Sequence, residues 1–213
     1  MSQASPQPAP RLPDGTLLEG IVTTLNADGS PNIAPMGPIV DPNFDRLLLR
    51  PFRTSITYQN LKRTGQGVLH VTDDVELLAH AAVGQLDPLP RLLPAESIEG
   101  VILADACRWN AFRTETIDDD EERTEILARV VDRGRLRDFF GFNRAKHAVV
   151  EAAILATRVG ILQPDAIRSE FERLAGIVGK TGGHQERRAF DFLDTYVRDA
   201  LVDPLHRAEA AGR

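Results

Sequence analysis

A run of arginine and hydroxyl side chains near residue 50 could bind a phosphate group. It reads Arg50-Pro51-Phe52-Arg53-Thr54-Ser55-Ile56-Thr57 and joins an apolar strand-like segment to a predicted helix. Arginine supplies a planar fork of donors, hydroxyls supply short donors, and a helix N-terminus supplies free N–H groups and a positive dipole end. The alternative is a capped helix beside surface arginines. The candidate phosphate ligands are Arg50, Arg53, Thr54, Ser55 and Thr57, with Lys62 further away.

A second segment, Ala34-Pro35-Met36-Gly37, could lie against a flat ring. Asp28-Gly29 is a strong hairpin signal, so the return strand runs directly into this segment. Small residues leave backbone groups accessible to a ring edge, and Met36 offers a soft side chain to a ring face. A fold that carries both segments would suit a phosphorylated planar cofactor, and flavin mononucleotide (FMN) is the obvious candidate. The alternative is a plain proline-rich loop.

Two further sets of polar residues leave both a structural and a binding role open. Asn60 lies in the helix predicted after Ser55, where its amide is more typical of a structural contact with local backbone than of a ligand contact. A C-terminal cluster holds Asn143, Arg144, Lys146 and His147. Arg144 and His147 share a helical face, with Glu151 one turn further on. They could clamp an anionic group, or form a solvated face with a His147–Glu151 contact; no metal site is predicted, because a third ligand is lacking.

Composition places the chain among ordinary globular proteins. It has 213 residues, 42% of them hydrophobic, and a formal net charge of -6, which argues against a nucleic-acid partner. No apolar run approaches the roughly 20 residues that span a bilayer, and no secretory signal is recognised, so we expect a cytoplasmic protein without a membrane partner. The one cysteine, Cys107, is expected to be a small core residue.

The first two thirds of the chain is predicted to be mainly β. A proline-rich tail over residues 1–16 is expected to be disordered. The part of the chain with Pro35 and Pro38 is expected to lie at a sheet edge or to leave the sheet. An acidic run at Asp118–Glu122 is interpreted as a solvated turn. The predicted strands are Leu17–Leu25, Asn32–Val40, Leu47–Pro51, Gly67–Thr72 and a hairpin of Gly100–Thr116 with Arg123–Arg133. The predicted helices are Ser55–Thr64, capped by Thr54 or Ser55 and ended by Gly65, and Val75–Val83, followed by a loop over Leu86–Glu96.

From Asp138 onward the apolar residues recur at helical spacing. Three stripes predict three helices, of which the second begins near Pro164. We therefore expect an α+β protein with a β-rich part over residues 17–135 and a three-helix C-terminal region over residues 136–205.

Two of these phrases resemble a known family. The Ala34-Pro35-Met36-Gly37 segment followed by Arg53-Thr54-Ser55 and an Asn60-containing helix resembles the flavin-reductase-like branch of the FMN-binding split barrels. The phrase Phe139-Phe140-Gly141-Phe142-Asn143-Arg144, with the helix that follows it, is similar to the signature of the domain-of-unknown-function family 447 (DUF447). That family pairs the split barrel with a helical C-terminal region.

The resemblance implies a split β-barrel that binds FMN at the interface of a homodimer. It does not imply a particular reaction. Our first hypothesis is an oxidoreductase in which bound FMN accepts hydride from NAD(P)H. The alternatives are a non-catalytic FMN-binding protein for storage, sensing or electron shuttling, and an interaction protein with an empty barrel. A link to tetrahydromethanopterin-dependent one-carbon metabolism is a family-level suggestion. No catalytic residue follows from the resemblance.

Overall fold

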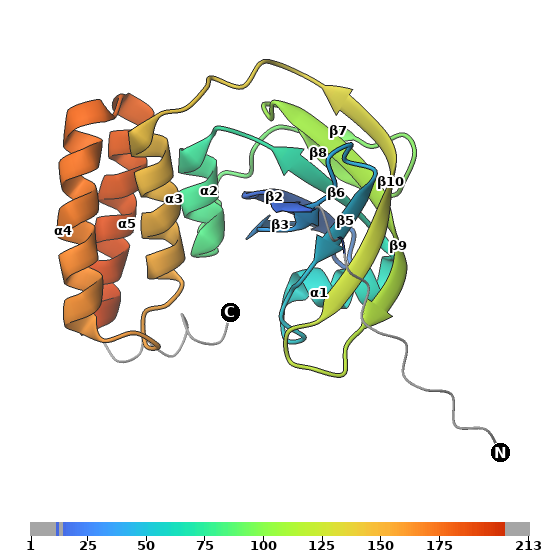
Figure 1. The fold of residues 1–213 in the computed structure, drawn as a ribbon, viewed down its shortest axis with the longest axis horizontal. Helices are drawn as coiled ribbons and strands as arrows, with labels where there is room; N and C mark the ends of the chain where they lie inside the picture. Colours follow the sequence, from blue (N-terminus) through green and yellow to red (C-terminus); the bar gives the residue numbers. More distant parts are fainter. Residues whose placement is uncertain (1–11, 13–14, 203–213) are drawn as a thin grey trace.

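The computed structural model describes residue 12 and residues 15–202, so the predicted disordered tail lies mostly outside the described residues. Within this part of the chain a strongly curled sheet stands beside a layer of helices (Figure 1). The strands are β1 (Thr16–Leu17), β2 (Gly20–Leu25), β3 (Pro31–Met36), β4 (Ile39–Val40), β5 (Arg46–Leu49), β6 (Gln66–Val71), β7 (Leu92–Pro94), β8 (Val101–Leu103), β9 (Arg108–Asp118) and β10 (Glu125–Arg135). The helices are α1 (Ile56–Thr64), α2 (Val75–Ala82), α3 (Arg144–Ala156), α4 (Pro164–Thr181) and α5 (His184–Val202).

Eight strands form one antiparallel sheet in the order β1-β4-β5-β10-β9-β6-β2-β3. The sheet curls into a half-barrel whose interior is filled by apolar side chains, among them Phe112, Leu47 and Leu61. α1 packs against β2, β3 and β6 and contributes Leu61 to this interior. The mixed α+β class is therefore confirmed, and no described helix is long and apolar enough to cross a membrane.

The predicted strand Asn32–Val40 is two strands at different places in the sheet. Residues up to Met36 form β3, which among the described strands pairs only with β2 and ends the sheet, as the prolines indicated. Ile39 and Val40 form β4, which pairs with β1 and β5 near the opposite end of the strand order. The chain leaves the ladder at Gly37-Pro38 because proline cannot donate a ladder hydrogen bond. Gly37 consequently lies at the point where the chain turns away from the sheet edge.

Other strand predictions also need correction. The predicted strand Leu17–Leu25 is divided by Leu18 and Glu19 into β1 and β2. The predicted strand Gly100–Thr116 is divided by a turn into β8 and β9, and β8 pairs with β7 in a region predicted to be a loop. These mispredictions of Leu17–Leu25 and Gly100–Thr116 involve strands of two or three residues, which are too short for a period-2 pattern to be recognised.

Trp109 on β9 packs over Gly134 of β10, where a Cβ would lie 2.5 Å from the ring nitrogen of Trp109.

α1 begins and ends where the sequence predicted. Ser55 is the N-cap, and its hydroxyl accepts a hydrogen bond of 3.2 Å from the N–H of Tyr58. Gly65 ends the helix with a φ of 66°, a left-handed conformation that costs glycine little. The strand before the helix ends at Leu49, so residues 50–55 form the connection that carries the candidate phosphate ligands.

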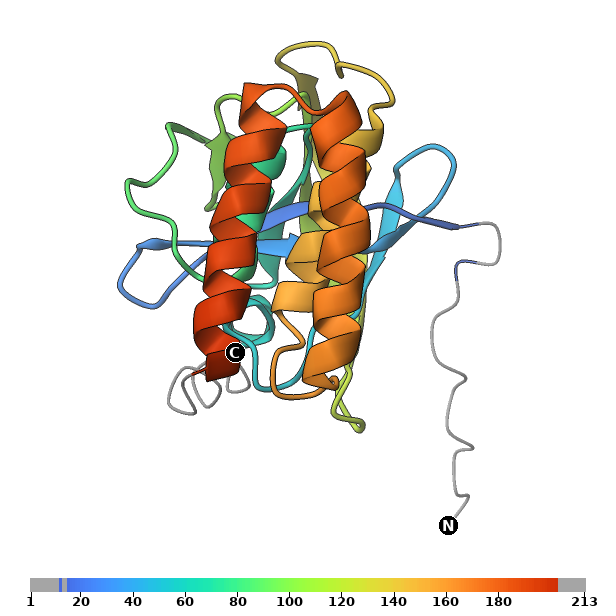
Figure 2. The ribbon, with the colours of Figure 1, turned by 90° about the vertical axis from the view of Figure 1, so that its left-hand side faces the viewer.

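The helical layer is not built from three C-terminal helices alone. Residues of α2, which lies between β6 and β7 in the chain, share one hydrophobic core with residues of α3, α4 and α5. α2 contacts both α3 and α5, while α4 and α5 form the outer pair (Figure 2). The reason is that α2 carries Val75, Leu78 and Ala79 on one buried face, and this face needs an apolar partner that the three helices supply.

His70 is a fully buried polar residue that ties three strands together. Its Nδ1 lies 3.1 Å from the carbonyl oxygen of Ile21 on β2, and its Nε2 accepts a hydrogen bond of 3.0 Å from the N–H of Leu103 on β8. Because Nε2 is an acceptor, the proton must be on Nδ1, which donates to Ile21. Burial lowers the pKa of His70 to about 4, so the ring is neutral at neutral pH.

We expect His70 to make folding pH-dependent between pH 6.5 and 4. In this window the unfolded chain binds a proton that the folded protein does not, so stability falls as the pH falls, by at most about 1.4 kcal/mol per pH unit. The variant His70→Gln can still donate and accept but cannot titrate, so its stability should change less with pH. Urea denaturation at several pH values measures both slopes, and equal slopes would contradict this assignment.

Candidate functional site

Arg50 carries the clearest unsatisfied group among the candidate phosphate ligands. It follows β5 directly, and the half-buried side chain places Nε out of contact with solvent. No hydrogen-bond partner for this buried Nε exists in the part of the chain that the structure describes. A buried guanidinium donor without a partner is costly. Such an atom indicates a partner outside the chain, and an anionic oxygen is the strongest acceptor for it.

Arg53, Thr54 and Ser55 have different surroundings. Arg53 is exposed, and its Nη1 donates to the carbonyl oxygen of Asp119 at 3.1 Å. Thr54 is exposed, and the Ser55 hydroxyl is used as the helix cap. The two arginines therefore differ: the guanidinium of Arg53 is held by the β9–β10 turn, whereas that of Arg50 keeps a free donor.

Thr57 and Asn60 belong to a buried polar network that joins α1 to β2 and β3. The amide of Asn32 donates to the hydroxyls of Thr57 at 3.0 Å and Thr24 at 3.1 Å. The amide of Asn60 donates to Thr24 at 3.1 Å and to the side-chain oxygen of Asn26 at 2.9 Å. Both α1 residues are thus engaged by protein groups, which fixes the first turns of α1 against the start of β3.

The acidic β9–β10 turn is more than a solvated turn. Asp119 accepts hydrogen bonds from the hydroxyl of Tyr58 and from Lys62, whose Nζ lies 2.5 Å from Oδ2. The hydrogen bond from Lys62, followed by that from Tyr58, holds the pKa of Asp119 below its usual range. Lys62 of α1 therefore binds this turn through Asp119 and holds it against the helix.

The segment Ala34–Gly37 occupies the end of the terminal strand β3. Its four residues are half-buried, and within residues 15–202 only β2 pairs with this strand. Beside its end lies Glu19, a residue that sequence reasoning missed. A Cβ built on Gly37 would lie 3.4 and 3.5 Å from the two carboxylate oxygens of Glu19. The local sequence does not indicate a role for Glu19, because Glu19 comes close to Gly37 only through the pairing of β2 with β3.

The C-terminal cluster divides into one structural residue and two exposed ones. Asn143 caps α3: its oxygen accepts from the N–H groups of Ala145 and Lys146, and its amide donates to the carbonyl of Thr181. Arg144 and His147 are exposed on α3. Their described surroundings show no hydrogen bond or ion pair to either side chain, and His147 stacks on Phe142 with ring centroids 6.1 Å apart in place of the alternative contact with Glu151.

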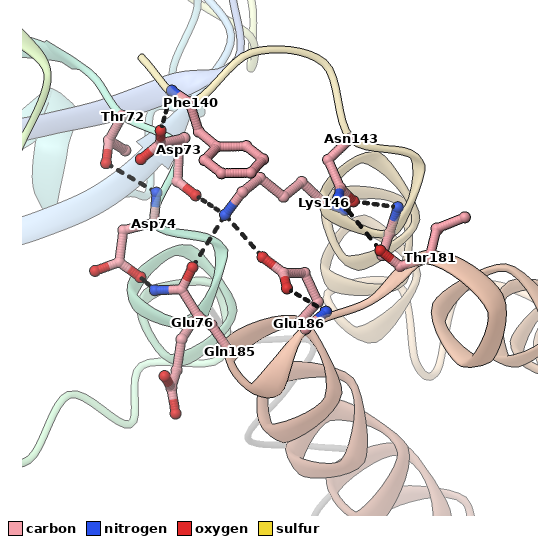
Figure 3. A network of polar contacts seen from close by, with 12 residues as sticks. Thr72, Asp73, Asp74, Glu76, Phe140, Asn143, Lys146, Thr181, Gln185 and Glu186 are labelled. Atoms are coloured by element: carbon pink, nitrogen blue, oxygen red, sulfur yellow. Dashed lines mark hydrogen bonds and ion pairs between the residues drawn. The ribbon is translucent and has the colours of Figure 1, made fainter. Parts of the chain in front are cut away.

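Lys146, unlike these two residues, belongs to a polar network between helices (Figure 3). Its Nζ lies 2.8 Å from Glu186 Oε1, 2.8 Å from the carbonyl oxygen of Asp73 and 3.1 Å from Gln185 Oε1. Burial favours the neutral form of Glu186, but Lys146 and hydrogen bonds from backbone N–H groups together outweigh it, so the pKa of Glu186 lies below its usual range. The network joins α3 to α5 and to the start of α2, and it borders an open cavity of about 460 Å³ that Phe140 and Arg137 also line.

Asp73 extends this network to the β10–α3 connection. Its carboxylate accepts hydrogen bonds from Arg137 at 2.5 Å and from the N–H of Phe140 at 2.6 Å. Burial by itself would raise the pKa of Asp73, but these donors lower it below its usual range. The polar groups of this network all have partners, so we assign it a structural role.

β3 connects the two regions in which the sequence predicted binding residues. At its start Asn32 contacts Thr57 of α1, and after its end Gly37 lies against Glu19. The charge of Glu151, which follows His147 by one turn on α3, raises the pKa of Glu19. The start of β3 therefore contacts α1, and the end of β3 lies near Glu19, which interacts electrostatically with α3.

Comparison with known proteins gives the family. Residues 18–137 match the model described as "Protein of unknown function (DUF447) N-terminal domain", and residues 143–195 match the model described as "Protein of unknown function (DUF447)". The chain belongs to the DUF447 family. The resemblance recognised from the sequence is thereby confirmed. No curated protein matches the chain.

Solved structures resemble this DUF447 protein to different extents. An FMN-bound protein of Methanosarcina mazei is 22% identical, with a TM-score of 0.72 over 87% of this chain and 95% of that chain. The flavoredoxin of Desulfovibrio vulgaris is 13% identical, with a TM-score of 0.48 over 62% of this chain and 76% of its own. An FMN-binding protein of Thermus thermophilus is 11% identical, with a TM-score of 0.47 over 64% and 79%. Only the first of these likenesses supports a common fold for most of the chain.

Proposed function

We propose that this DUF447 protein binds FMN and transfers hydride between reduced nicotinamide and an acceptor. The observation that carries the proposal is the buried, unpaired Nε of Arg50 at the entrance to α1. Family membership and the fold shared with an FMN-bound protein support the choice of FMN. The same Arg50 Nε fits the cofactor, because a phosphate supplies the acceptor that the chain lacks.

In this proposal the residues before α1, at the end of β3 and on α3 bind different parts of the cofactor. Arg50 and the first N–H groups of α1 hold the phosphate, with Arg53, Thr54, Ser55 and Thr57 shaping the turn around it. Asn60 keeps α1 against β2. The residues Ala34, Pro35, Met36 and Gly37 hold the ring, and Arg144 and His147 offer exposed donors from α3, where Asn143 fixes the first turn.

When bound, FMN would supply the hydride chemistry itself, so no protein nucleophile is needed. The protein contributes binding and orientation of the two reactants. We further propose a homodimer. The exposed apolar side chains of Phe52 and Ile56, 53% and 55% exposed beside the phosphate segment, support an interface there. The molar mass from light scattering tests it, and a monomer in the FMN-bound state would contradict it.

The visible spectrum of the purified protein is the first test of this function. We expect flavin absorption, release of FMN on denaturation, and oxidation of NADH or NADPH by the FMN-loaded protein. A loaded protein that oxidises neither would instead be a non-catalytic FMN-binding protein. A colourless protein that also fails to bind added FMN would overturn the proposal.

Replacing Arg144 tests the contribution of α3. Arg144→Ala should weaken FMN binding by up to about fivefold, because an exposed ion pair contributes about 0.2–1 kcal/mol. The melting temperature should stay unchanged, since the side chain makes no described contact. Arg158→Ala, which removes another exposed arginine just after α3, is the matched control. Equal FMN affinity of the two variants, measured by fluorescence titration, would remove Arg144 from the site.

A further inference from the structure

Glu19 is a carboxylate held at the ring-binding segment by the fold. It lies in the two-residue connection between β1 and β2, and both of its carboxylate oxygens are within van der Waals distance of where a Gly37 side chain would begin. Leu17 lies on the same side of Gly37, with Cδ2 at 3.2 Å from that position. A Cβ at position 37 would be in ordinary contact with the carboxylate, and a longer side chain would compete with it for this space. The absence of a side chain there lets Glu19 approach the backbone that follows β3.

The carboxylate of Glu19 has no positively charged partner. In the described part of the chain it makes no hydrogen bond and no ion pair, whereas Asp119 and Asp73 are paired with Lys62 and Arg137. The segment Ala34–Pro38 carries no titratable side chain. The Glu19 carboxylate is therefore the charged group nearest to a ring bound at this segment.

The charged group that acts on the Glu19 carboxyl is another carboxylate, that of Glu151. Partial burial raises the pKa of Glu19, and Glu151 on α3 raises it further. Glu151 itself is close enough to Arg173 of α4 to raise the pKa of that guanidinium, after the larger effect of Glu170. Arg144 and His147 share the helical face of Glu151 but make no described contact with Glu19. Of the two carboxylates, Glu19 thus lacks a cation to keep it ionised.

We propose that the Glu19 carboxyl binds a proton from solvent when the cofactor at Ala34–Gly37 becomes reduced. This rests on the proposed function. A hydride carries two electrons and one proton, so its transfer adds one negative charge to the site. One proton taken up on a Glu19 oxygen restores the original charge, and reoxidation releases it. Glu19 neither forms nor breaks a bond to carbon, and the electrons come from the nicotinamide or from a chemical reductant such as dithionite.

The test compares the FMN-loaded protein with its Glu19→Gln variant, which keeps size and shape but cannot ionise. Infrared difference spectra on reduction with dithionite should show the carbonyl band of a protonated carboxyl in the wild type and not in Glu19→Gln. The reduction potential, measured from pH 5 to 9, should show one additional proton per two electrons in the wild type over part of this range. Glu99→Gln, an exposed carboxylate on the β7–β8 connection, should behave like the wild type.

Three outcomes separate this inference from the proposed function. If Glu19→Gln binds FMN but keeps the band and the proton stoichiometry, Glu19 is not the group that is protonated and only the inference fails. If Glu151→Gln moves the additional proton uptake to lower pH, the two carboxylates interact as the structure indicates. If neither protein binds FMN, the proposed function fails, and the role of Glu19 fails with it.

Discussion

Replacement of Lys146 by methionine is expected to destabilise the protein by about 3–5 kcal/mol. The ion pair between Lys146 and Glu186 is nearly buried, with side-chain exposures of 13% and 8%. Without Lys146, the charge of Glu186 would be stabilised only by backbone N–H groups, those of Gly183 and of Glu186 itself. An unpaired buried carboxylate costs far more than the pair gains over an apolar substitute. Urea denaturation at pH 7 measures the loss.

A double variant distinguishes loss of the charge partner from loss of packing. In Lys146→Met with Glu186→Gln the buried charge is gone, and the glutamine oxygen can still accept from Gly183. We expect most of the lost stability to return. If the double variant is as unstable as the single one, the network in Figure 3 contributes through the packing of the lysine stem and not through its charge.

Replacement of Arg50 by alanine should weaken FMN binding by about 2–5 kcal/mol, or roughly 30-fold or more. Arg50 Nε is buried and unpaired, so a phosphate oxygen would gain a charge-assisted hydrogen bond in a site shielded from water. Riboflavin lacks the phosphate, so its affinity should change little. Removal of an unsatisfied donor should leave the free protein as stable as before, or more so.

The matched control for Arg50 is Arg53→Ala. Arg53 is exposed and already donates to Asp119, so its loss should cost FMN affinity less than loss of Arg50. Fluorescence titrations with FMN and riboflavin give the four affinities. If Arg50→Ala weakens both ligands equally, the arginine supports the fold and does not contact a phosphate.

The features predicted well from the sequence depend on neighbours in the chain. Ser55 and Gly65 bound α1 because a cap and a left-handed residue act within one helical turn. Pro35 placed its strand at the sheet edge because a missing N–H is a property of the residue itself. Cys107 was expected in the core and is buried there. The family phrase around Phe142 and Asn143 was recognisable for the same reason, since it is continuous in sequence.

Other features depend on contacts between distant residues. The sequence did not indicate that α2 would pack against the C-terminal helices, because an apolar helix face can pack against any other apolar surface. Nor did it show that Arg50 would keep a buried donor free while Arg53 bound Asp119, since that depends on the β9–β10 turn reaching α1. Glu19 came next to Gly37 only through the pairing of strands.

The sequence by itself thus determined the family and the helix and strand types of the longer elements, and it predicted candidate residues for binding a phosphorylated ring. The tertiary structure decided which of those residues are already engaged by the protein. Thr57, Asn60 and Asn143 have protein partners, whereas Arg50, Arg144 and His147 have donors to offer. The physical reason is that local propensities act over a few residues, while hydrogen bonding and burial of a side chain depend on elements far away in the chain.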